Sequence, residues 1–463
     1  MSRAPSSPYD ALSQNQRWWV VLIVSLGVVA SILPSGSFNV AIPALMKDFG
    51  LGHDSVQFVV TTFMVTNTVA MLAAPWLIQR FGLRRCFEAT MAVLLITSLV
   101  GSLSPSFNLL LGARLIQGST AAMMAPMGSI VVMRLFTPDR QGRAYGINSL
   151  AVTLALALAP ALAGLLVDLW GWRAVSLLPL PVGLLAWWGA RRLLFREPLG
   201  AEAPFDWMGM GLLSLLTLAW LACFSRPGGG PSLAWSAGCM GVSLLAIGAF
   251  VLHLQRSAAP ILGGGLFQRR TLMLGGGVSF LTGFGMYGAM YLMPVFLQSV
   301  MGLSASHAGA AQIPGTLALS LTFPVAGILA DRWTPHKLMA WGLAVFTASF
   351  VVLWHYGETV TYLGFILITI VGRIGQSFAL TPINKAALAN LHGRVLSEAS
   401  MLLNYLRQLG GVLGVAGAAA YVEWRAHSLG EGSHALATAF SEGYLVVAVA
   451  LALAILVATR MGR

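Results

Sequence analysis

Charged side chains are scarce in this sequence. Asp, Glu, Lys and Arg together make up 9% of its 463 residues, whereas hydrophobic residue types make up 57%. In a soluble globular domain about a quarter of the residues are charged. The shortage therefore excludes a soluble globule and predicts a protein that crosses a membrane several times.

Acidic residues are the scarcer of the two signs. The chain has 27 Lys and Arg against 15 Asp and Glu, a formal net charge of +12. In a soluble chain this excess would suggest a nucleic-acid partner. Here the basic residues stand in short gaps between apolar runs, which is the distribution of the positive-inside rule, so no nucleic-acid partner is expected.

Cysteine is rare as well. Cys86, Cys223 and Cys239 lie in or beside apolar runs without metal-ligand spacing, so neither a disulfide framework nor a metal site is expected. No nucleotide-binding P-loop is present, which excludes ATP as a direct energy source for this chain alone, and no cofactor is expected. Arg3 and Arg17 precede a first apolar run that is too long for a signal peptide, so we expect this run to remain as a helix.

Long apolar runs fill most of the sequence. A membrane-crossing helix needs about 20 apolar residues, and fourteen runs meet this requirement. They predict an all-α membrane protein with fourteen transmembrane helices. The runs cover roughly residues 18–45, 56–78, 87–103, 107–133, 144–167, 174–194, 207–225, 234–254, 272–297, 307–330, 338–355, 361–389, 399–422 and 438–459.

Basic residues alternate between dense and sparse gaps. The dense gaps hold Arg80, Arg84, Arg85, Arg140, Arg143, Arg191, Arg192, Arg196, Arg256, Arg269, Arg270, Arg332 and Lys337. The sparse gaps hold Lys47, Arg173, Arg226 and Arg425, one in each. Because cytoplasmic loops carry the excess of Lys and Arg, the dense gaps are expected in the cytoplasm together with both chain termini.

The fourth and the twelfth run resemble each other. Each carries an arginine with a glutamine three residues later, Arg114 with Gln117 and Arg373 with Gln376. An offset of eight runs favours two related six-helix bundles with two inserted helices between them. The expected units are a bundle over residues 1–195, the inserted pair over 196–264 and a second bundle over 265–463.

Six short segments, in order, match one family. They are FNVAIPAL in the first run, ARLIQGSTAAMMAP in the fourth, APALAGLL in the fifth, FDWMGM in the seventh, GILADR at the end of the tenth and NYLRQLGGVLGVA in the thirteenth. In these segments the chain resembles the major facilitator superfamily, and within it the fourteen-span drug:proton antiporters of the EmrB/QacA type. The resemblance implies the major facilitator fold.

The resemblance also implies a function. It predicts a secondary-active exporter of small amphipathic compounds that works by alternating access in the lipid bilayer of the bacterial inner membrane. Protons are the coupling ion that it implies, and a periplasmic adaptor protein is a further partner. Two alternatives stay open: a lipid or anionic-metabolite transporter with other or no ion coupling, and a receptor or scaffold on the same fold. An enzyme is not expected, because only Asp331 with His336 approaches a catalytic pair.

The segment LIQRFGLRR at residues 77–85 resembles the family's gap between the second and third spans. The family has an acid where Gln79 stands, whereas GILADR keeps Asp331 and Arg332 in the second half. The resemblance implies a cytoplasmic gate, and the alternative is that these charges set topology alone. The expected gating residues are Arg80, Gly82, Arg84, Arg85, Asp331 and Arg332.

The segment ALALAPALAG at residues 155–164 resembles the antiporter motif of the fifth span. Pro160 has no backbone N–H, and Gly164 lets a neighbouring helix approach closely. These residues favour a bend on which the bundles rock. A kinked packing helix is the alternative.

A buried acid is what the sequence lacks most clearly for a proton-coupled protein. The family usually carries one in the first span, where Pro34 stands here. Among the acids we assign only Glu88 and Asp168 to spans, each near an end, and no histidine to a span centre. Coupling is therefore expected to use Arg114 with a bound water or the substrate, or to be absent.

Arginines occupy the predicted membrane core instead. Arg114, Arg373 and Arg407 lie deep enough to need a wet cavity or a partner, although Arg114 alternatively snorkels to a surface. We therefore expect a preference for anionic, zwitterionic or neutral amphipathic substrates over cations. The residues expected at the cavity are Arg114, Gln117, Asn39, Arg373, Gln376, Arg407, Asn404, Tyr287 and Tyr291, with core packing as the alternative for the tyrosines.

Overall fold

The structure is a computed structural model. It describes residues 13–136, 138–195, 204–224, 233–257, 260–357, 359–388, 391, 393–430 and 433–461. Within these ranges the regular secondary structure is helical throughout. The all-α prediction is therefore confirmed. Two predictions fall outside the described part of the chain. One is the side chain of Asp331, and the other is the boundary between the first bundle and the inserted pair, because the segment after Phe195 is not described.

Each predicted span falls on a long helix. In chain order these helices are α1 (Gln14–Phe49), α3 (Phe58–Phe81), α4 (Leu83–Ser102), α5 (Phe107–Leu135), α6 (Pro138–Trp170), α8 (Leu180–Leu193), α9 (Trp207–Phe224), α10 (Leu233–Arg256), α11 (Arg270–Ser299), α13 (Gln312–Arg332), α14 (Pro335–Tyr356), α15 (Tyr362–Ala387), α16 (Gly393–Leu429) and α17 (Ser433–Arg460). In the described part of the chain, ten segments are long and apolar enough to cross a membrane. The exact number of crossings stays a prediction.

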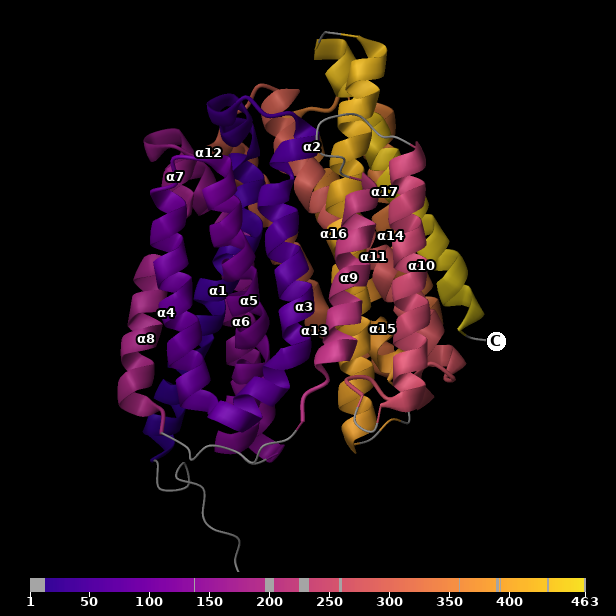
Figure 1. The fold of residues 1–463 in the computed structure, drawn as a ribbon. Coiled ribbons are helices and arrows are strands. Elements are labelled where there is room, and N and C mark those ends of the chain that lie inside the picture. Colours follow the sequence, from indigo (N-terminus) through magenta and orange to yellow (C-terminus); the bar gives the residue numbers. More distant parts are fainter. Residues whose placement is uncertain are drawn as a thin grey trace, which may run out of the picture.

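Four short helices lie between the long ones. They are α2 (His53–Val56), α7 (Trp172–Val175), the 3₁₀ turn η2 (Gly264–Leu266) and α12 (Ala305–Ala310). Three of them, α2, α7 and α12, lie at the upper end of the molecule (Figure 1). The sequence did not predict them, because each is too short to show a hydrophobic period.

The long helices form two sets that stand side by side (Figure 1). In the N-terminal set α1 packs on α6 and α3 packs on α5. The corresponding helices of the C-terminal set pack in the same pairs, α11 on α16 and α13 on α15. The two sets meet through α6 with α12 and α13, and through α3 with α16.

The inserted helices α9 and α10 pack on each other as a hairpin, and α9 lies against α3 and α16. Asp206, directly before α9, fixes the lower end of this hairpin. Its carboxylate accepts hydrogen bonds from the backbone N–H of Gly209 (2.8 Å) and of Ile261 (2.9 Å). It also contacts His253 Nε2 at 2.7 Å, and its side chain is 4% exposed.

The Asp206 carboxylate stays charged at physiological pH. Burial by itself would raise its pKa, but the hydrogen bonds from Gly209, Ile261 and His253 outweigh burial and hold the pKa below its usual range. A carboxylate whose pKa is lowered by folding stabilises the folded state at every pH above its ordinary pKa of about 4. This stabilisation is lost only as the pH falls below that value and through the lowered pKa. The charge of the Asp206 carboxylate should therefore not change between pH 8 and pH 5.

We expect Asp206→Asn to loosen the inserted hairpin. The amide nitrogen of asparagine replaces one of the two acceptor oxygens and brings a donor toward an N–H donor, and a lost charge-assisted hydrogen bond costs about 1.5–3 kcal/mol. The unfolding temperature of the purified protein should fall by several degrees. Arg256→Gln is the matched control, because Arg256 is an exposed neighbour at the end of α10. Equal unfolding temperatures for the two variants would contradict this assignment.

Candidate transport site and gates

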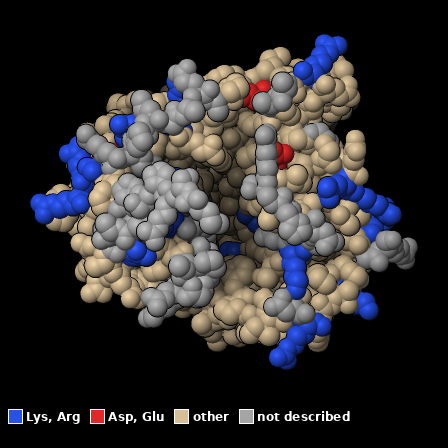
Figure 2. Space-filling model, turned by 90° about the horizontal axis from the view of Figure 1, so that it is seen from below, with Lys and Arg blue, Asp and Glu red and all other residues tan. Residues whose placement is uncertain are grey.

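The lower face of the molecule is hollowed at its centre. Figure 2 shows this face, with Lys and Arg atoms inside the hollow and on its rim, and few Asp or Glu atoms in view. The helix directions place the α3–α4, α13–α14 and α15–α16 junctions at this end. The hollow is the candidate substrate site.

The upper end is closed by a direct contact between α6 and α12. Asp168 Oδ1 accepts a hydrogen bond from the Ala305 N–H (3.2 Å), and Oδ2 accepts one from the Ser306 N–H (2.8 Å). A Cβ atom on Gly164 would lie 2.2 Å from the Ala305 carbonyl oxygen, and one on Gly309 would lie 2.1 Å from the Pro160 carbonyl oxygen. The two backbones touch, so only glycine fits at either position.

A second contact at the upper end joins α2 to the C-terminal set. The backbone N–H of His53 donates to Glu423 Oε2 at 2.8 Å, and its ring Nδ1 lies 3.2 Å from the Tyr291 hydroxyl. The His53 ring also packs edge-on against Phe440, with centroids 5.7 Å apart. His53 is 6% exposed. This cluster, with the α6–α12 contact, forms the upper seal.

The predicted gating residues divide between the two ends. Pro160 and Gly164 belong to the upper seal, where they contact the other set directly. Arg84 bonds Glu88 Oε1 (2.7 Å) and the carbonyl oxygens of Leu194 (2.8 Å) and Arg191 (2.7 Å), so it ties α4 to α8 within the N-terminal set.

The remaining gating candidates also lie at the lower end. The Arg80 guanidinium lies over the rings of Trp76 and Phe81, and Gly82 has a φ of 81° at the turn into α4. Arg85 and Arg332 are exposed. The gating role of these residues stays a prediction.

Arg114 is fully buried in the N-terminal set. Its Nε donates to the Val59 carbonyl oxygen (2.8 Å) and its Nη1 to Gln117 Oε1 (3.1 Å). The guanidinium lies between two rings, with the centroids of Phe38 and Phe63 each 4.4 Å from Cζ. Within the described part of the chain its Nη2 has no hydrogen-bond partner, and Arg114 is 0% exposed. Aromatic faces stand where a carboxylate would usually balance such a charge.

Arg373 repeats only part of this arrangement. Its Nη1 donates to Gln376 Oε1 at 2.9 Å, as Arg114 does to Gln117. Unlike Arg114, Arg373 is partly exposed, and its stem packs on Gly315 of α13. The two arginines therefore differ in burial, whereas Gln117 and Gln376 are both buried.

Arg407 is the third predicted cavity arginine. It is partly exposed on α16 and donates a hydrogen bond to Asn404 Oδ1. The Tyr287 ring packs on Gly411, where Met64 from the N-terminal set also reaches.

The two remaining candidates are buried. Tyr291 is 0% exposed and belongs to the upper seal, one turn above Tyr287. Asn39 is 2% exposed, and its Oδ1 accepts no hydrogen bond among the described residues. The structure thus places Arg373, Arg407, Asn404 and Tyr287 at partly exposed positions, and Arg114, Gln117 and Asn39 in the core of the N-terminal set.

Residues 24–415 match the family model described as Major Facilitator Superfamily. The chain belongs to this superfamily. The resemblance drawn from the six short segments is thereby confirmed, and with it an integral membrane protein of a transporter family.

Two similar proteins carry names that refer to multidrug resistance, and a third is named as an uncharacterized transporter. The chain is 29% identical over 384 residues to "Multidrug resistance protein B homolog" of Mycobacterium tuberculosis. This match covers 82% of this chain and 71% of the relative. It is 29% identical over 408 residues to "Putative multidrug resistance protein MdtD" of Escherichia coli O81, with 86% and 84% covered. It is also 27% identical over 406 residues to "Uncharacterized MFS-type transporter YhcA" of Bacillus subtilis, with 85% and 74% covered.

Solved structures of superfamily members share the fold. A bacterial homologue of the human lysosomal transporter Spinster, described as inward-facing and unoccupied, superposes with a TM-score of 0.71 at 16% identity, covering 97% of this chain and 98% of that one. An auto-inhibited POT family peptide transporter superposes with a TM-score of 0.69 at 18% identity, covering 96% of each chain. Identities this low support the fold alone.

One acidic residue inside a predicted span was missed in the sequence. Glu442 lies within the last predicted span, in addition to the two acids assigned to spans. Its carboxylate accepts two hydrogen bonds from Arg425, at 2.6 and 2.8 Å, and one from the Tyr421 hydroxyl at 2.9 Å. Arg425 and Tyr421 lie on the preceding helix α16. The pair joins the upper ends of α16 and α17, away from the hollow.

Proposed function

We propose that the protein exports small amphipathic compounds by alternating access and that the structure represents its cytoplasm-open state. The upper seal and the hollow lower face support this proposal, because an alternating-access protein closes one end while the other is open. The relatives named for multidrug resistance favour export of small molecules.

The orientation of the chain is part of the proposal. The lower end carries the α3–α4 gap with Arg80, Arg84 and Arg85, and the α13–α14 gap with Arg332 and Lys337. This bias supports a cytoplasmic lower face in a bacterial inner membrane. An even number of crossings then places both termini in the cytoplasm.

The substrate class rests on one observation: the partly exposed charges deep in the C-terminal set are arginines. Among the described residues, Arg373 and Arg407 each donate a hydrogen bond only to a neutral amide, that of Gln376 and of Asn404 respectively. A desolvated cation would need a counter-charge, and these residues supply the opposite sign. We propose that both face the hollow and that anionic, zwitterionic or neutral amphipathic compounds are the substrates.

Lipid or anionic-metabolite transport is the second candidate, and the same arginines favour it. Proton coupling, as the resemblance to drug:proton antiporters implies, is proposed for the first candidate, whereas the second would use another ion or none. A periplasmic adaptor protein is a further partner that the resemblance implies. A pH gradient imposed across inverted vesicles separates coupled from uncoupled transport.

We expect Arg373→Ala to impair anion transport selectively. Loss of a charged hydrogen-bond donor costs about 1.5–3 kcal/mol, which corresponds to about tenfold or more in binding. Flux of an anionic amphiphile and of ethidium should be measured in inverted vesicles, with and without a pH gradient. Wild type should carry the anion faster than ethidium, and the variant should lose most of the anion flux.

Arg269→Ala is the matched control, because Arg269 is an exposed basic residue directly before α11. It should behave as wild type. Strong ethidium export that Arg373→Ala leaves unchanged would contradict the proposed substrate class and favour an ordinary cation exporter.

A further inference from the structure

A groove runs along the outer side of the N-terminal set, between α3, α4 and α5. It has a volume of about 380 Å³, within the range of ligand sites in proteins. Leu77, Ala89 and Ile116 represent the three helices in its lining. Val93 and Ile116, which also line it, are 37% and 44% exposed, so the groove opens sideways toward the bilayer rather than into the hollow.

Arg85 is the one charged residue that lines this groove. It lies in the first turn of α4, at the lower end, where the dipole of the helix also favours an anion. Its side chain is exposed and has no hydrogen bond or ion pair within the described residues, whereas the neighbouring Arg84 makes three bonds. A guanidinium in this position is available to bind a phosphate through two parallel N–H donors.

The groove extends from Arg85 along one face of α4. Arg85, Ala89 and Val93 are spaced by four residues, so they lie one above another and span about 12 Å at 1.5 Å per residue. A charge at the cytoplasmic boundary followed by an apolar channel in the membrane is complementary to a phosphate headgroup followed by an acyl chain.

We propose that this groove binds one anionic phospholipid of the cytoplasmic leaflet. The headgroup phosphate pairs with Arg85, and an acyl chain lies between α3, α4 and α5 against Ala89 and Val93. The bilayer supplies this ligand at the depth and on the side at which the groove opens. The site is independent of the substrate that the protein transports.

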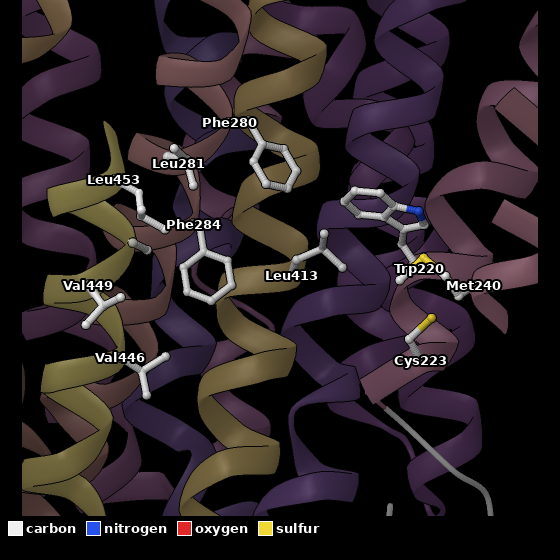
Figure 3. Close-up of a pocket in the computed structure, with 11 residues that line it drawn as sticks. Trp220, Cys223, Met240, Phe280, Leu281, Phe284, Leu413, Val446, Val449 and Leu453 are labelled. Atoms are coloured by element: carbon white, nitrogen blue, oxygen red, sulfur yellow. The ribbon is translucent and has the colours of Figure 1, made fainter. Parts of the chain in front are cut away.

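A second groove in the same molecule provides a comparison. It lies between the inserted hairpin and the C-terminal set, has a volume of about 390 Å³ and is lined by side chains such as Trp220, Phe284 and Leu413 (Figure 3). No Lys, Arg, Asp or Glu is among its lining residues. It should therefore take up apolar chains without selecting a headgroup, whereas the Arg85 groove selects for charge.

Native mass spectrometry of the full-length protein tests this proposal. Phosphatidylglycerol and phosphatidylethanolamine are titrated separately onto delipidated protein. Wild type should retain one phosphatidylglycerol more tightly than phosphatidylethanolamine. Arg85→Ala should weaken phosphatidylglycerol binding about tenfold, to the level of phosphatidylethanolamine, because a charge-assisted contact is lost. Arg269→Ala, exposed but in neither groove, should match wild type.

Ala89→Phe tests the acyl-chain half of the site. Ala89 is exposed toward the membrane, so phenylalanine fills the groove without entering the core. It should weaken binding of both lipids at this site, with the unfolding temperature as a check on folding. Undiminished lipid binding by Ala89→Phe would overturn the placement of the chain. Equal phosphatidylglycerol affinity in wild type and Arg85→Ala, or an equal loss in Arg269→Ala, would overturn the headgroup contact.

Discussion

Gly164→Val is expected to abolish most of the transport while leaving a folded protein in the membrane. A Cβ atom at position 164 would lie 2.2 Å from the Ala305 carbonyl oxygen and 2.6 Å from its carbon. Both are backbone atoms, so α6 and α12 must separate before any side chain fits. Overpacking of this kind costs about 1–3 kcal/mol, and 1.4 kcal/mol changes an equilibrium about tenfold. The cost falls on the state in which the upper seal is closed.

The consequence is a shift toward the state that is open at the upper end. Vesicle flux should fall about tenfold or more, because the transport cycle cannot return through the sealed state. A cysteine at Ala308, which is 0% exposed on α12, should react with a membrane-impermeant maleimide only after the seal separates. Labelling should be low in the parent protein and should rise when Gly164→Val is added.

Gly112→Val is the matched control for this experiment. Gly112 is also a glycine inside a helix, but nothing lies within 4 Å of the position that its Cβ would take. The variant should transport as wild type does, because the substitution changes only the helix propensity of position 112, from that of glycine to that of valine. Normal flux in Gly164→Val, or an equal loss in Gly112→Val, would show that the α6–α12 contact does not limit the cycle.

The upper seal shows which parts of the site can be predicted from the sequence. Pro160 and Gly164 stood out because a proline and a small residue in one span favour a bend and a close approach. The partner of that approach, α12, could not be predicted, because contacts between distant segments leave no local pattern. The predicted spans coincide with helices because length and hydropathy alone determine where a chain can cross a bilayer.

His53 and Glu442 were missed for related reasons. His53 stands between two predicted spans, where a single histidine reads as part of a loop, and only the fold brings it against Tyr291 and Glu423. Glu442 pairs with Arg425, which the sequence alone presented as an isolated basic residue in a sparse gap. In both cases the hydrogen-bond or ion-pair partner lies on another helix, so the sequence alone does not reveal it.

For Arg114 the sequence predicted the need for a partner but not the partner itself. A buried charge signalled that a partner was needed, and the sequence offered no acid. The structure supplies the rings of Phe38 and Phe63 and the Val59 carbonyl oxygen instead. A cation–π contact contributes about 2 kcal/mol when it is desolvated, so two of them offset a substantial part of the cost of burial.

Lysine substitutions at the two repeated arginines should therefore have unequal effects. Arg114 uses a planar group to stack between two rings while it donates in two directions, to Val59 and to Gln117. The compact ammonium of lysine cannot reproduce that plane. Leaving a buried acceptor unpaired costs about 1–3 kcal/mol. Arg114→Lys should lower anion flux about tenfold or more and should also lower the unfolding temperature.

Arg373→Lys is the matched counterpart and should be tolerated. Arg373 is partly exposed and donates one bond, to Gln376, which a lysine ammonium at the same height can also make. If Arg373 acts as a cation facing the hollow, its charge matters more than its shape. Lysine keeps that charge, so anion flux should stay within about threefold of wild type. Equal losses in both variants would mean that the two arginines play the same part despite their different burial. A tolerated Arg114→Lys would mean that the stack between Phe38 and Phe63 contributes little, and the buried charge would then need another source of stabilisation.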